Sequence, residues 1–562
     1  MRKKRMMCFG LAVVMTVGSL AACGKSDDNE KQEDKTKSAE STGPADPFGK
    51  YADPIDIHFA RSTEDVLEGY ESAIGQSMDD NLWLDTFKEE LGIKVVYDWV
   101  VKGDAYKQKV NVTIASGDLP DVMAVDATQM TQLAESGLIQ DLSDVYESYA
   151  ADFTKESMKQ EGEEPFMAAQ IDGGLYGIPV TFGSYDSGDL LWIRDDWLDK
   201  LNLEAPKTTD ELMNVIDKFT KEDPDGNGKD DTYGLAAHGT PSIFEGGYGC
   251  LKGFFNSYGA YPSIWIEKDG KLEYGAVQDE CKDALEVLQK LYVDKKINPE
   301  FGVMDDNKAG EPAVVGQSGM SYGPQWLGLV QPQENYNNDE NAKWSAYPIP
   351  GTDGDMGTAE VNLATNQWLV VRKDFKHPEA VIKMANVFME KCWGKTGDNA
   401  KYYAPEDAGS LWKFSPVMPN LPLKNFDAYD QIQEAMKNKT TDQLTGEAKT
   451  IYSKLDKYYS GSEDGKQFYG WERIYGPAPT SYASIKEMKD SGHIIMNKFV
   501  GAPTPTMTEK MSTLEKMRNE TFNKIIIGEA DINEFDKFVK EFNKLGGEDI
   551  TKEVNEWYTS VQ

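Results

Sequence analysis

One stretch of the sequence, residues 173–231, limits the possible folds more than any other. It begins with a short apolar segment, Leu175–Val180, in which a glycine and a proline predict a strand that ends in a bend. A polar, aromatic loop over Phe182–Asp189 leads to a second apolar segment, Leu190–Arg194, which has the composition of a buried strand. We expect the chain to leave one α/β lobe here and to begin building the next.

Two helices are predicted directly after this second strand. The first covers Asp195–Leu201 and ends before a polar segment that contains a proline. Thr208 or Thr209 then caps the second helix, and Glu211 is close enough to complete a capping box. Apolar residues at helical spacing extend the second helix over Leu212–Phe219.

The region before this stretch alternates strands with helices. The pattern predicts strands at Ile55–Phe59, Ile93–Val100 and Leu119–Val125 and helices at Asn81–Leu91 and Tyr106–Ala115. Such alternation is typical of an α/β fold with a largely parallel sheet. Ligand clefts in these sheets lie beyond the carboxyl ends of the strands. Arg61 and Asp126, which follow the first and third of these strands, are therefore candidates for the rim of a cleft.

The amino terminus has the layout of a secretory signal peptide. Four basic residues near the start precede an apolar segment that reaches Leu20 and is too short to span a membrane comfortably. The segment ends in Leu-Ala-Ala-Cys, which resembles a bacterial lipobox, so residues 1–22 would be removed and Cys23 would carry the lipid. The alternative is an ordinary signal peptide cut after Ala22, with Cys23 as a free thiol.

Residues 23–50 are rich in Lys, Asp, Glu, Ser and Thr and nearly free of large apolar residues. Such a segment cannot bury enough surface to fold, and we expect a flexible tether. The lipid would hold the protein on the extracellular face of the bacterial cytoplasmic membrane, with several acyl chains because one chain binds only marginally.

Charge and reactive side chains exclude several classes of function. The chain has a formal net charge of −36, and removal of the basic amino terminus makes it more negative. Nucleic acid and anionic lipid surfaces are therefore excluded as partners. Cys250, Cys281 and Cys392 have spacings that suit neither a disulfide framework nor a zinc site, and buried thiols or a single disulfide remain open. The four histidines are scattered singly, which argues against a histidine-based metal centre.

Several segments, in this order, resemble a known family. They are DLPDVMAVD (118–126), LYGIPV (175–180), LLWIRDDWLDKLNLEAPKTTDEL (190–212), GQSGMSYGPQW (316–326), AYPIPGTDG (346–354) and NQWLVVRKDFKHPEAVIKMANVFME (366–390). Together they resemble the bacterial extracellular solute-binding proteins of family 1. These are the carbohydrate-capturing subunits of ABC importers, and they include maltose- and alginate-binding proteins. Residues 503–558 resemble the long, LplA-type lipoprotein branch of this family.

The resemblance implies an α/β, periplasmic-binding-protein-like type II fold, in which two lobes close on a ligand by a hinge. The implied N-terminal lobe holds residues 51–182 and 369–425, and the C-terminal lobe holds residues 187–362 and 440–562. The chain would cross between them near Val180–Asp189, Thr365–Trp368 and Asn420–Asn438. The implied function is capture of a carbohydrate, an oligosaccharide in this branch, by a monomer that delivers it to ABC transporter permease subunits.

The acidic loop DPDGNGKDD that starts at Asp223 places oxygen donors at the spacing of an EF-hand calcium loop. The side chains of Asp223, Asp225, Asn227 and Asp231 and the carbonyl of Lys229 would bind Ca²⁺ in a structural role. Position twelve is a glycine where the EF-hand has a bidentate glutamate, and a solvated turn is the alternative. Similar loops in alginate-binding relatives favour calcium.

Sugar-binding sites combine flat aromatic faces with fixed polar groups. Trp326 is the main candidate, because GMSYGPQW resembles the turn that presents a stacking tryptophan in the maltose-binding relatives; the alternative is a core tryptophan. Residues 468–477 (FYGWERIYGP) are flanked by glycine and proline, which predicts an exposed loop. The remaining candidate ligand contacts are Trp471, Glu472, Arg473 and Tyr475 in that loop, Tyr185 and Asp186 in the first crossing, Trp368 in the second, and Arg61 and Asp126. Trp99, Trp192 and Trp197 lie in apolar patterns that predict core positions.

Two other classes of function stay open. An exported glycan-active enzyme would need catalytic groups, but the sequence has no nucleophile elbow, metal-binding histidine pair or phosphate loop, so we assign no catalytic residue. A tethered adhesion or ligand-sensing protein would share the same fold. The chain does not identify the sugar. Its negative charge disfavours strongly anionic glycans unless a local basic pocket, with Arg61 or Arg473, overrides it.

Overall fold

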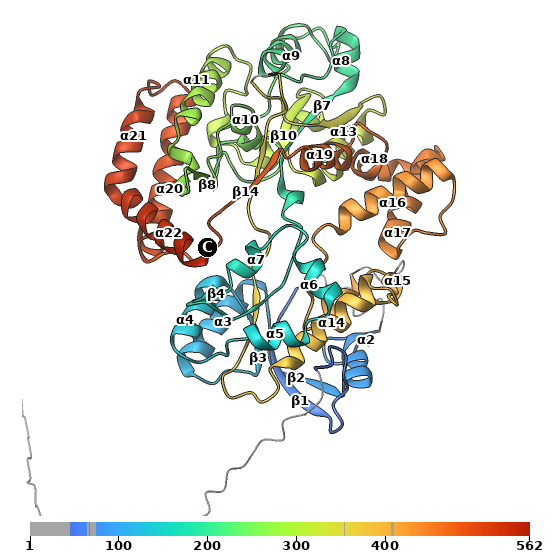
Figure 1. Cartoon of the computed structure of the whole chain (residues 1–562). Coiled ribbons are helices and arrows are strands. Elements are labelled where there is room, and N and C mark those ends of the chain that lie inside the picture. Colours follow the sequence, from blue (N-terminus) through green and yellow to red (C-terminus); the bar gives the residue numbers. More distant parts are fainter. Residues whose placement is uncertain (1–44, 65–66, 68–74, 353, 406–409) are drawn as a thin grey trace, which may run out of the picture. The chain divides into compact units, whose positions relative to one another are not determined.

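The structure is a computed structural model that describes residues 45–64, 67, 75–352, 354–405 and 410–562. The predicted signal peptide, Cys23 and most of the predicted tether lie outside these residues. Residues 46–562, whose helices and strands are drawn in Figure 1, form one compact unit. Its buried side chains gather into two hydrophobic cores. We call the parts of the chain around these cores the first lobe and the second lobe.

The first lobe is built on a five-stranded sheet in the order β2-β1-β3-β13-β6. Its strands are β1 (Ile55–Thr63), β2 (Ile93–Lys102), β3 (Val122–Val125), β6 (Ile178–Pro179) and β13 (Trp368–Val371). Strand β1 runs parallel to β2 and β3, as the alternation of strands and helices predicts. Strand β13 is antiparallel to both β3 and β6. The prediction of a largely parallel sheet is therefore correct only for β1, β2 and β3.

Helices pack around this sheet. They are α2 (Leu82–Thr86), α3 (Gly103–Ser116), α4 (Ala127–Glu135), α5 (Ser143–Tyr149), α6 (Asp152–Met158), α7 (Glu164–Met167), α14 (Glu379–Trp393) and α15 (Asn399–Tyr402). A π-helical turn, Phe87–Leu91, extends α2 to the end of the predicted helix. Strands β4 (Gln170–Ile171) and β5 (Gly174–Leu175) form a small hairpin. Helix α14 is the most buried of these helices, because most of its residues contact the first core.

The second lobe has a three-stranded antiparallel sheet in the order β10-β7-β11. These strands are β7 (Leu190–Arg194), β10 (Met320–Gly323) and β11 (Trp344–Tyr347). A hairpin of β8 (Trp265–Lys268) and β9 (Lys271–Tyr274) and a parallel pair of β12 (Ala359–Val361) and β14 (Ile494–Met496) complete its strands. All five residues of β7 are buried, and Trp192 and Trp197 are core residues as predicted.

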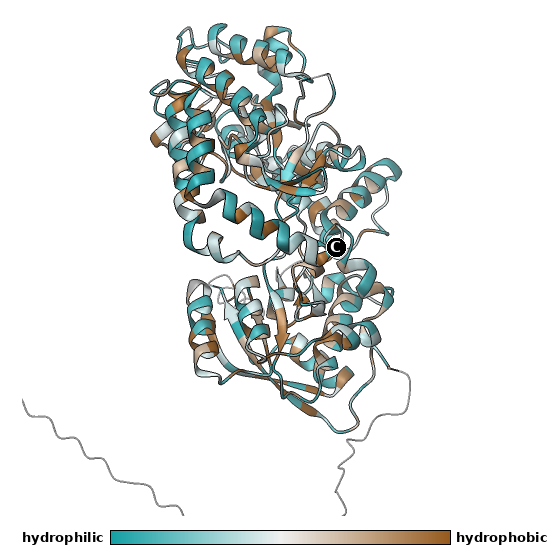
Figure 2. Ribbon diagram, turned by 60° about the vertical axis from the view of Figure 1, so that its left-hand side comes forward, coloured by the Kyte–Doolittle hydropathy of each residue, from teal (hydrophilic) through white to brown (hydrophobic). Residues whose placement is uncertain are grey.

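The rest of the second lobe is mostly helical. Its helices are α8 (Asp195–Leu201), α9 (Thr209–Lys221), α10 (Lys252–Ser257), α11 (Asp279–Val293), α12 (Asp306–Val314), α13 (Gln331–Asn338), α16 (Lys424–Asn438), α17 (Gly446–Tyr459), α18 (Tyr469–Tyr475), α19 (Ser481–Asp490), α20 (Pro505–Ile526), α21 (Glu534–Phe542) and α22 (Glu548–Val561). Thr208 caps α9 and forms the predicted capping box with Glu211. Figure 2 shows brown and teal residues interspersed along the helices, as expected of helices that pack one side on a core and expose the other.

The chain passes between the two cores several times. The first passage lies between Val180 and Leu190, the second between Ala359 and Trp368, and the third between Leu421 and Phe426. The first and third lie side by side, since the Thr181 hydroxyl donates a hydrogen bond to the carbonyl of Asn420 at 2.6 Å. The third crossing was expected around Asn420–Asn438; residues 424–438 of this range form helix α16, and its buried side chains belong to the second core.

The structure distinguishes the two alternatives for the cysteines. Cys250, Cys281 and Cys392 are buried free thiols, which agrees with the first of the two alternatives considered.

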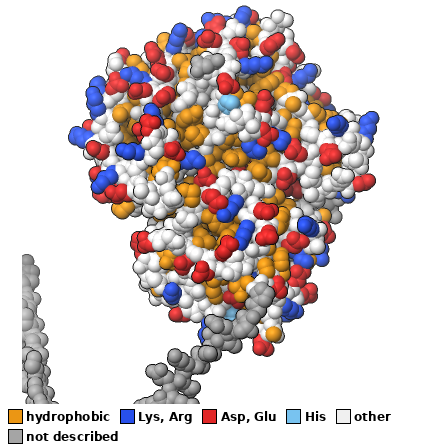
Figure 3. All heavy atoms as spheres, viewed as in Figure 1, with side chains coloured by type: hydrophobic (Ala, Val, Ile, Leu, Met, Phe, Trp, Pro, Cys, Tyr) orange, Lys and Arg blue, Asp and Glu red, His pale blue; other side chains and the backbone are white. Residues whose placement is uncertain are grey.

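Within the described ranges, no helix combines the length and the apolar character that crossing a membrane requires. On the face shown in Figure 3, acidic and basic side chains are interspersed, and hydrophobic side chains reach the surface in several patches.

Candidate ligand-binding site

Trp326 presents an exposed aromatic face on the second lobe. It lies in the short 3₁₀ turn Gln325–Leu329, and 42% of its surface is exposed. The turn is anchored to the second core, because the buried Trp192 indole donates a hydrogen bond to the Pro324 carbonyl at 3.2 Å. Gly247 lies against the edge of the ring, and a Cβ atom at this position would come within 2.9 Å of the Trp326 Cη2 atom. The sequence thus holds a large flat apolar surface in solvent, where a sugar ring can stack.

The segment 468–477 is a helix rather than the predicted loop. Helix α18 packs closely on the turn that carries Trp326, since a Cβ on Gly470 would lie 2.3 Å from the Gly328 carbonyl oxygen. Tyr475 is buried at 6% exposure, so it is a core residue. Trp471 is half-buried and stacks on Tyr475 with 6.2 Å between ring centroids. Only Trp471 of this aromatic pair retains surface for a ligand.

Glu472 and Arg473 are engaged with each other. The Glu472 carboxylate is 3% exposed, accepts hydrogen bonds from the Arg473 guanidinium, and accepts another from the Tyr459 hydroxyl at 2.9 Å. Arg473 also donates to the carbonyl of Trp344 at 3.1 Å. This network ties α18 to strand β11. Both residues therefore have a structural role here.

The first lobe has a cavity of about 210 Å³ at the carboxyl end of β1. Its walls include the side chains of Arg61, Tyr106, Phe182, Gln367, Trp412 and Lys413. Trp412 is held by stacking on Tyr403, with 5.6 Å between centroids and 7° between planes, and by an edge contact with Phe182 at 6.2 Å. The cavity thus combines aromatic, amide and cationic groups, which is the composition expected of a site for a polar, ring-containing ligand.

Arg61 is the buried cation of this cavity. Its side chain is 9% exposed, and its Nη2 donates to the carbonyl of Lys413 at 2.6 Å. Its Nε is buried and has no hydrogen-bond partner. Burial lowers the pKa of Arg61. Strand β1 extends to Thr63, so Arg61 lies near the carboxyl end of the strand rather than after it, and it lines this hollow.

Asp126 lies outside this cavity. It is the N-cap of α4, where its side chain accepts from the backbone of Gln129 at 2.9 Å, and it pairs with Lys107 at 2.7 Å. Trp368 is 3% exposed in the first core and donates from its indole to the Pro165 carbonyl at 2.9 Å. The structure therefore brings neither residue together with Arg61.

Tyr185 and Asp186 lie in the first crossing, in a 3₁₀ turn over Tyr185–Ser187. The Asp186 carboxylate accepts from the Asn425 amide at 2.6 Å and from the Tyr482 hydroxyl at 3.0 Å, and burial raises its pKa. Glu161 of the first lobe accepts from the backbone N–H of Tyr185 at 3.1 Å. Asp186 thus fixes the crossing segment to the second lobe, while Tyr185 is partly buried against the second core.

Sequence reasoning did not find Phe182, Gln367, Trp412 and Lys413. The signals were weak but present. Phe182 and Gln367 lie at the start of the first crossing and in the second, and Trp412 and Lys413 are an aromatic and a cation in an irregular segment. Trp99, predicted as a core residue, is half-buried and packs on Tyr106 at 5.4 Å.

The acidic loop after α9 gathers the predicted calcium ligands without bringing their carboxylates into one group. The Asn227 amide donates to Asp225 at 2.6 Å and to Asp231 at 3.0 Å, and Asp223 accepts from the backbone of Gly228 at 3.1 Å. Across the part of the chain that the structure describes, no three His, Cys, Asp or Glu side chains are grouped to hold a metal ion. The loop nevertheless has one oxygen that could bind a cation, because Oδ1 of Asp223 is buried without a hydrogen-bond partner among the described residues. Burial raises the pKa of Asp225, and the carboxylates of Asp223 and Asp231 raise it further.

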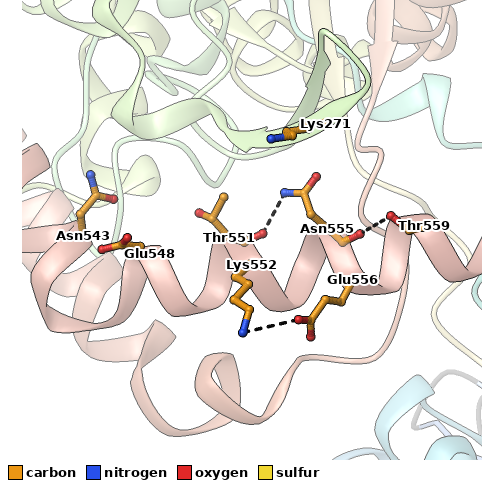
Figure 4. A pocket seen from close by; sticks show the side chains of 8 residues that line it. All are labelled: Lys271, Asn543, Glu548, Thr551, Lys552, Asn555, Glu556 and Thr559. Carbon is orange, nitrogen blue, oxygen red and sulfur yellow. Dashed lines mark hydrogen bonds and ion pairs between the residues drawn. The ribbon is translucent and has the colours of Figure 1, made fainter.

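A hollow of about 950 Å³ on the second lobe lies along α22 and is lined by none of these groups (Figure 4). Its side chains are polar and already bonded: Lys552 pairs with Glu556, and the Asn555 amide donates to the carbonyls of Thr551 and Leu272, each at 2.8 Å. The residues that line it include no aromatic side chain. A groove of this composition offers no face for a sugar ring, and we do not assign it to ligand binding.

Comparison with known proteins places the chain in context. The curated relatives include lipoprotein LipO of Bacillus subtilis, 24% identical over 85% of this chain and 88% of the relative. They also include the polygalacturonan/rhamnogalacturonan-binding protein YtcQ of Bacillus subtilis, 25% identical over 82% of this chain and 84% of the relative.

Solved structures with the same fold include an extracellular solute-binding protein from Bifidobacterium longum subsp. infantis. It has a TM-score of 0.60 and 17% identity, and the match covers 91% of this chain and 99% of that one. Another is an EF-hand mutant of the substrate-binding protein FusA of Streptococcus pneumoniae in complex with fructo-nystose, with a TM-score of 0.52, 18% identity, and 90% and 99% covered. These similarities establish the two-lobe fold of the solute-binding proteins. The family model described as "Bacterial extracellular solute-binding protein" matches residues 69–391, more than half of the chain, and the protein therefore belongs to that family.

Proposed function

We propose that this protein captures an oligosaccharide outside the cell and delivers it to the permease subunits of an ABC importer. The observation that carries the proposal is the 42% exposure of Trp326, a large aromatic side chain held in solvent by a rigid turn. A large apolar surface that the fold holds in water gains free energy when a ligand covers it. The exposure of Trp326 therefore favours a binding role over a core role. The printed names of YtcQ and of the FusA complex, which refer to polysaccharides and to an oligosaccharide, support the same ligand class.

The aromatic groups of the two lobes have complementary roles in this proposal. Trp326 of the second lobe stacks on the apolar face of a sugar ring, and the first-lobe cavity of Arg61, Gln367 and Trp412 binds hydroxyl and charged groups. Hinge closure around the bound ligand is favoured because contacts to both lobes form together only in the closed state. The protein binds its ligand without chemical change, and it acts as a monomer.

Anchoring and localisation are part of the same proposal. Cys23 carries the lipid after removal of residues 1–22, and residues 23–50 tether the lobes to the extracellular face of the cytoplasmic membrane. The lipobox-like sequence and the lipoprotein name of a relative support this. Labelling with radioactive palmitate tests it: Cys23→Ser should abolish incorporation and release the protein into the medium.

We also propose that the loop at residues 223–231 binds Ca²⁺ in a structural role. The oxygen donors fit the preference of Ca²⁺ for carboxylate, amide and carbonyl groups, and the unpartnered Oδ1 of Asp223 is a donor that a cation would use. Asp223, Asp225, Asn227, Asp231 and the carbonyl of Lys229 would hold the ion, which would neutralise the neighbouring carboxylates. The mention of an EF-hand in the FusA structure supports this assignment.

Isothermal titration of the purified chain with neutral and acidic oligosaccharides tests the capture function. At least one sugar should bind, Trp326→Ala should weaken it at least 10-fold, and Trp326→Phe, which keeps an aromatic face, should weaken it less. Binding only of peptides or other solutes would contradict the carbohydrate assignment. Release of new reducing ends from the sugar would identify an enzyme instead.

A further inference from the structure

Arg61 differs from the other buried arginines of the described residues. Arg194 forms an ion pair with Asp196, and Arg518 donates hydrogen bonds to the Pro262 carbonyl, the Tyr274 hydroxyl and the Asn519 amide. Among the described residues, Arg61 has one strong acceptor, the Lys413 carbonyl, and a weak sulfur contact with Met418 at 3.6 Å. Its buried Nε has no hydrogen-bond partner there. The guanidinium of Arg61, which lines the cavity, can therefore donate further hydrogen bonds.

Among the described residues, the charge of Arg61 also has no ion-pair partner. The carboxylate of Glu64 acts on Arg61 only at longer range, and it is paired with Lys413 at 2.8 Å. Within the ranges that the structure describes, no carboxylate lies at ion-pair distance from Arg61. A buried charge without a partner is unfavourable unless something that binds there supplies the opposite charge. Since Arg61 is 9% exposed and lines a cavity of about 210 Å³, a bound ligand is the available source of that charge.

The surroundings of Arg61 specify what kind of anion fits. Trp412 and Phe182 offer aromatic surface beside the guanidinium, and Gln367 offers an amide that can bind hydroxyl groups. A guanidinium matches a planar carboxylate through two parallel hydrogen bonds. A sugar ring that carries a carboxylate would satisfy the aromatic, amide and cationic groups at the same time, whereas a free inorganic anion would use only the cation.

We propose that Arg61 binds a carboxylate of the ligand, so that the captured oligosaccharide is an acidic one that contains uronic acid residues. This inference rests on the proposed function, that is, on capture of an oligosaccharide. The overall negative charge of the protein does not oppose it at short range, because a directly contacting, desolvated cation outweighs distant charges that salt screens.

Calorimetric titration with trigalacturonic acid and with its fully methyl-esterified form tests the inference, since esterification removes the charge of each carboxylate and adds only a methyl group. The wild-type protein should bind the acid at least 10-fold more tightly than the ester. Arg61→Gln should weaken the acid about 10- to 100-fold, the usual range for loss of a charge-assisted pair, and should change the ester less than 3-fold. Arg372→Gln is the matched control: it removes the same charge from the first lobe, but from an arginine that is half-exposed and paired with Asp121 at 2.6 Å. It should leave the preference for the acid unchanged.

Other results would overturn the inference in distinguishable ways. Equal binding of acid and ester by the wild type, or tight binding of neutral oligosaccharides alone, would refute the role of Arg61 and leave the capture function intact. Binding of inorganic phosphate or sulfate that Arg61→Gln abolishes, without binding of the acid sugar, would mean that the cavity takes a free anion. If no sugar of any charge binds, the proposed function fails together with this inference. Even if Arg61→Gln does not fold, the difference between the affinities of the wild-type protein for the acid and for the ester tests whether the ligand is acidic.

Discussion

The ammonium of Lys454 lies 3.4 Å from the centre of the Trp471 ring, so that a cation from α17 covers one face of an aromatic side chain on α18. The electron-rich face of the indole attracts the ammonium. Burial lowers the pKa of Lys454 to about 8, and the carboxylate of Glu447 opposes this shift. The face of Trp471 that Lys454 covers is thus not open to a ligand while the lysine stays in this position.

This contact predicts a titration of the Trp471 fluorescence near pH 8. As the pH rises through this value, Lys454 loses its charge and its attraction to the ring, and the emission of Trp471 should change. The signal is the difference between the wild type and Trp471→Phe, which removes the contribution of the other tryptophans. Lys454→Met should abolish the transition, whereas Lys457→Met, a lysine on the same helix that lies over Phe468, should preserve it. A transition that survives Lys454→Met would refute the assignment.

Calcium should raise the melting temperature of the protein. A ligand that binds only the folded state stabilises it by RT ln(1 + [L]/Kd), so chelator should lower the melting temperature and added Ca²⁺ should restore it. Asp225→Ala removes a proposed ligand and should abolish the response to Ca²⁺. Asp230→Ala removes the same charge from the same loop at a position that is not a proposed ligand, and it should retain the response. If calcium has no effect on the wild type, the loop is only a turn.

Features that depend on neighbouring residues could be predicted from the sequence. Leu190–Arg194, the helix that follows it and the capping box of Thr208 and Glu211 are encoded within a few positions, and all three occur as expected. Trp326 is exposed because of a local turn, and the resemblance of GMSYGPQW to the turn in the maltose-binding relatives pointed to it.

Features that depend on contacts between distant residues could not be predicted from the sequence. The glycines around Trp471 predict a loop, but Gly470 allows α18 to lie directly against Gly328, and this packing makes a helix with Tyr475 inside. Trp412 belongs to the first-lobe cavity because of its contacts with Phe182 and Tyr403, which no sequence period reveals. The antiparallel direction of β13 likewise follows from the return of the chain from the second lobe.

Loss of the N-cap of α9 should destabilise the second lobe. The Thr208 hydroxyl accepts from the backbone N–H of Glu211 at 3.2 Å, and the Glu211 carboxylate accepts from the backbone of Thr208 at 3.2 Å. Thr208→Ala removes the first of these bonds, and such changes cost about 1 kcal/mol of stability. The melting temperature should fall for Thr208→Ala but stay close to the wild-type value for Thr208→Ser, which keeps the hydroxyl. Equal melting temperatures for the wild type and Thr208→Ala would show that the cap does not contribute to stability.

The buried carboxyl of Glu360 should make the stability of the protein fall as the pH rises from about 5 to 7. Glu360 is 1% exposed, its Oε2 accepts from the backbone of Ser263 at 3.2 Å, and its Oε1 has no partner. Burial raises its pKa from 4.5 to about 7, while the Lys252 ammonium lowers it in part. Between these two values the folded state holds a proton that the unfolded state has lost, so the free energy of unfolding decreases with rising pH.

Replacement of Glu360 by glutamine tests this pH dependence, because the amide has the size of the protonated carboxyl but cannot ionise. At pH 5 the carboxyl is protonated in the folded protein, and wild type and Glu360→Gln should have similar melting temperatures. At pH 8 the variant should be the more stable of the two, by on the order of 2 kcal/mol, since it avoids a buried charge. The measurement is the melting temperature at closely spaced pH values from 5 to 8. A pH profile that is the same in both proteins would show that Glu360 ionises as readily in the folded state as in the unfolded one.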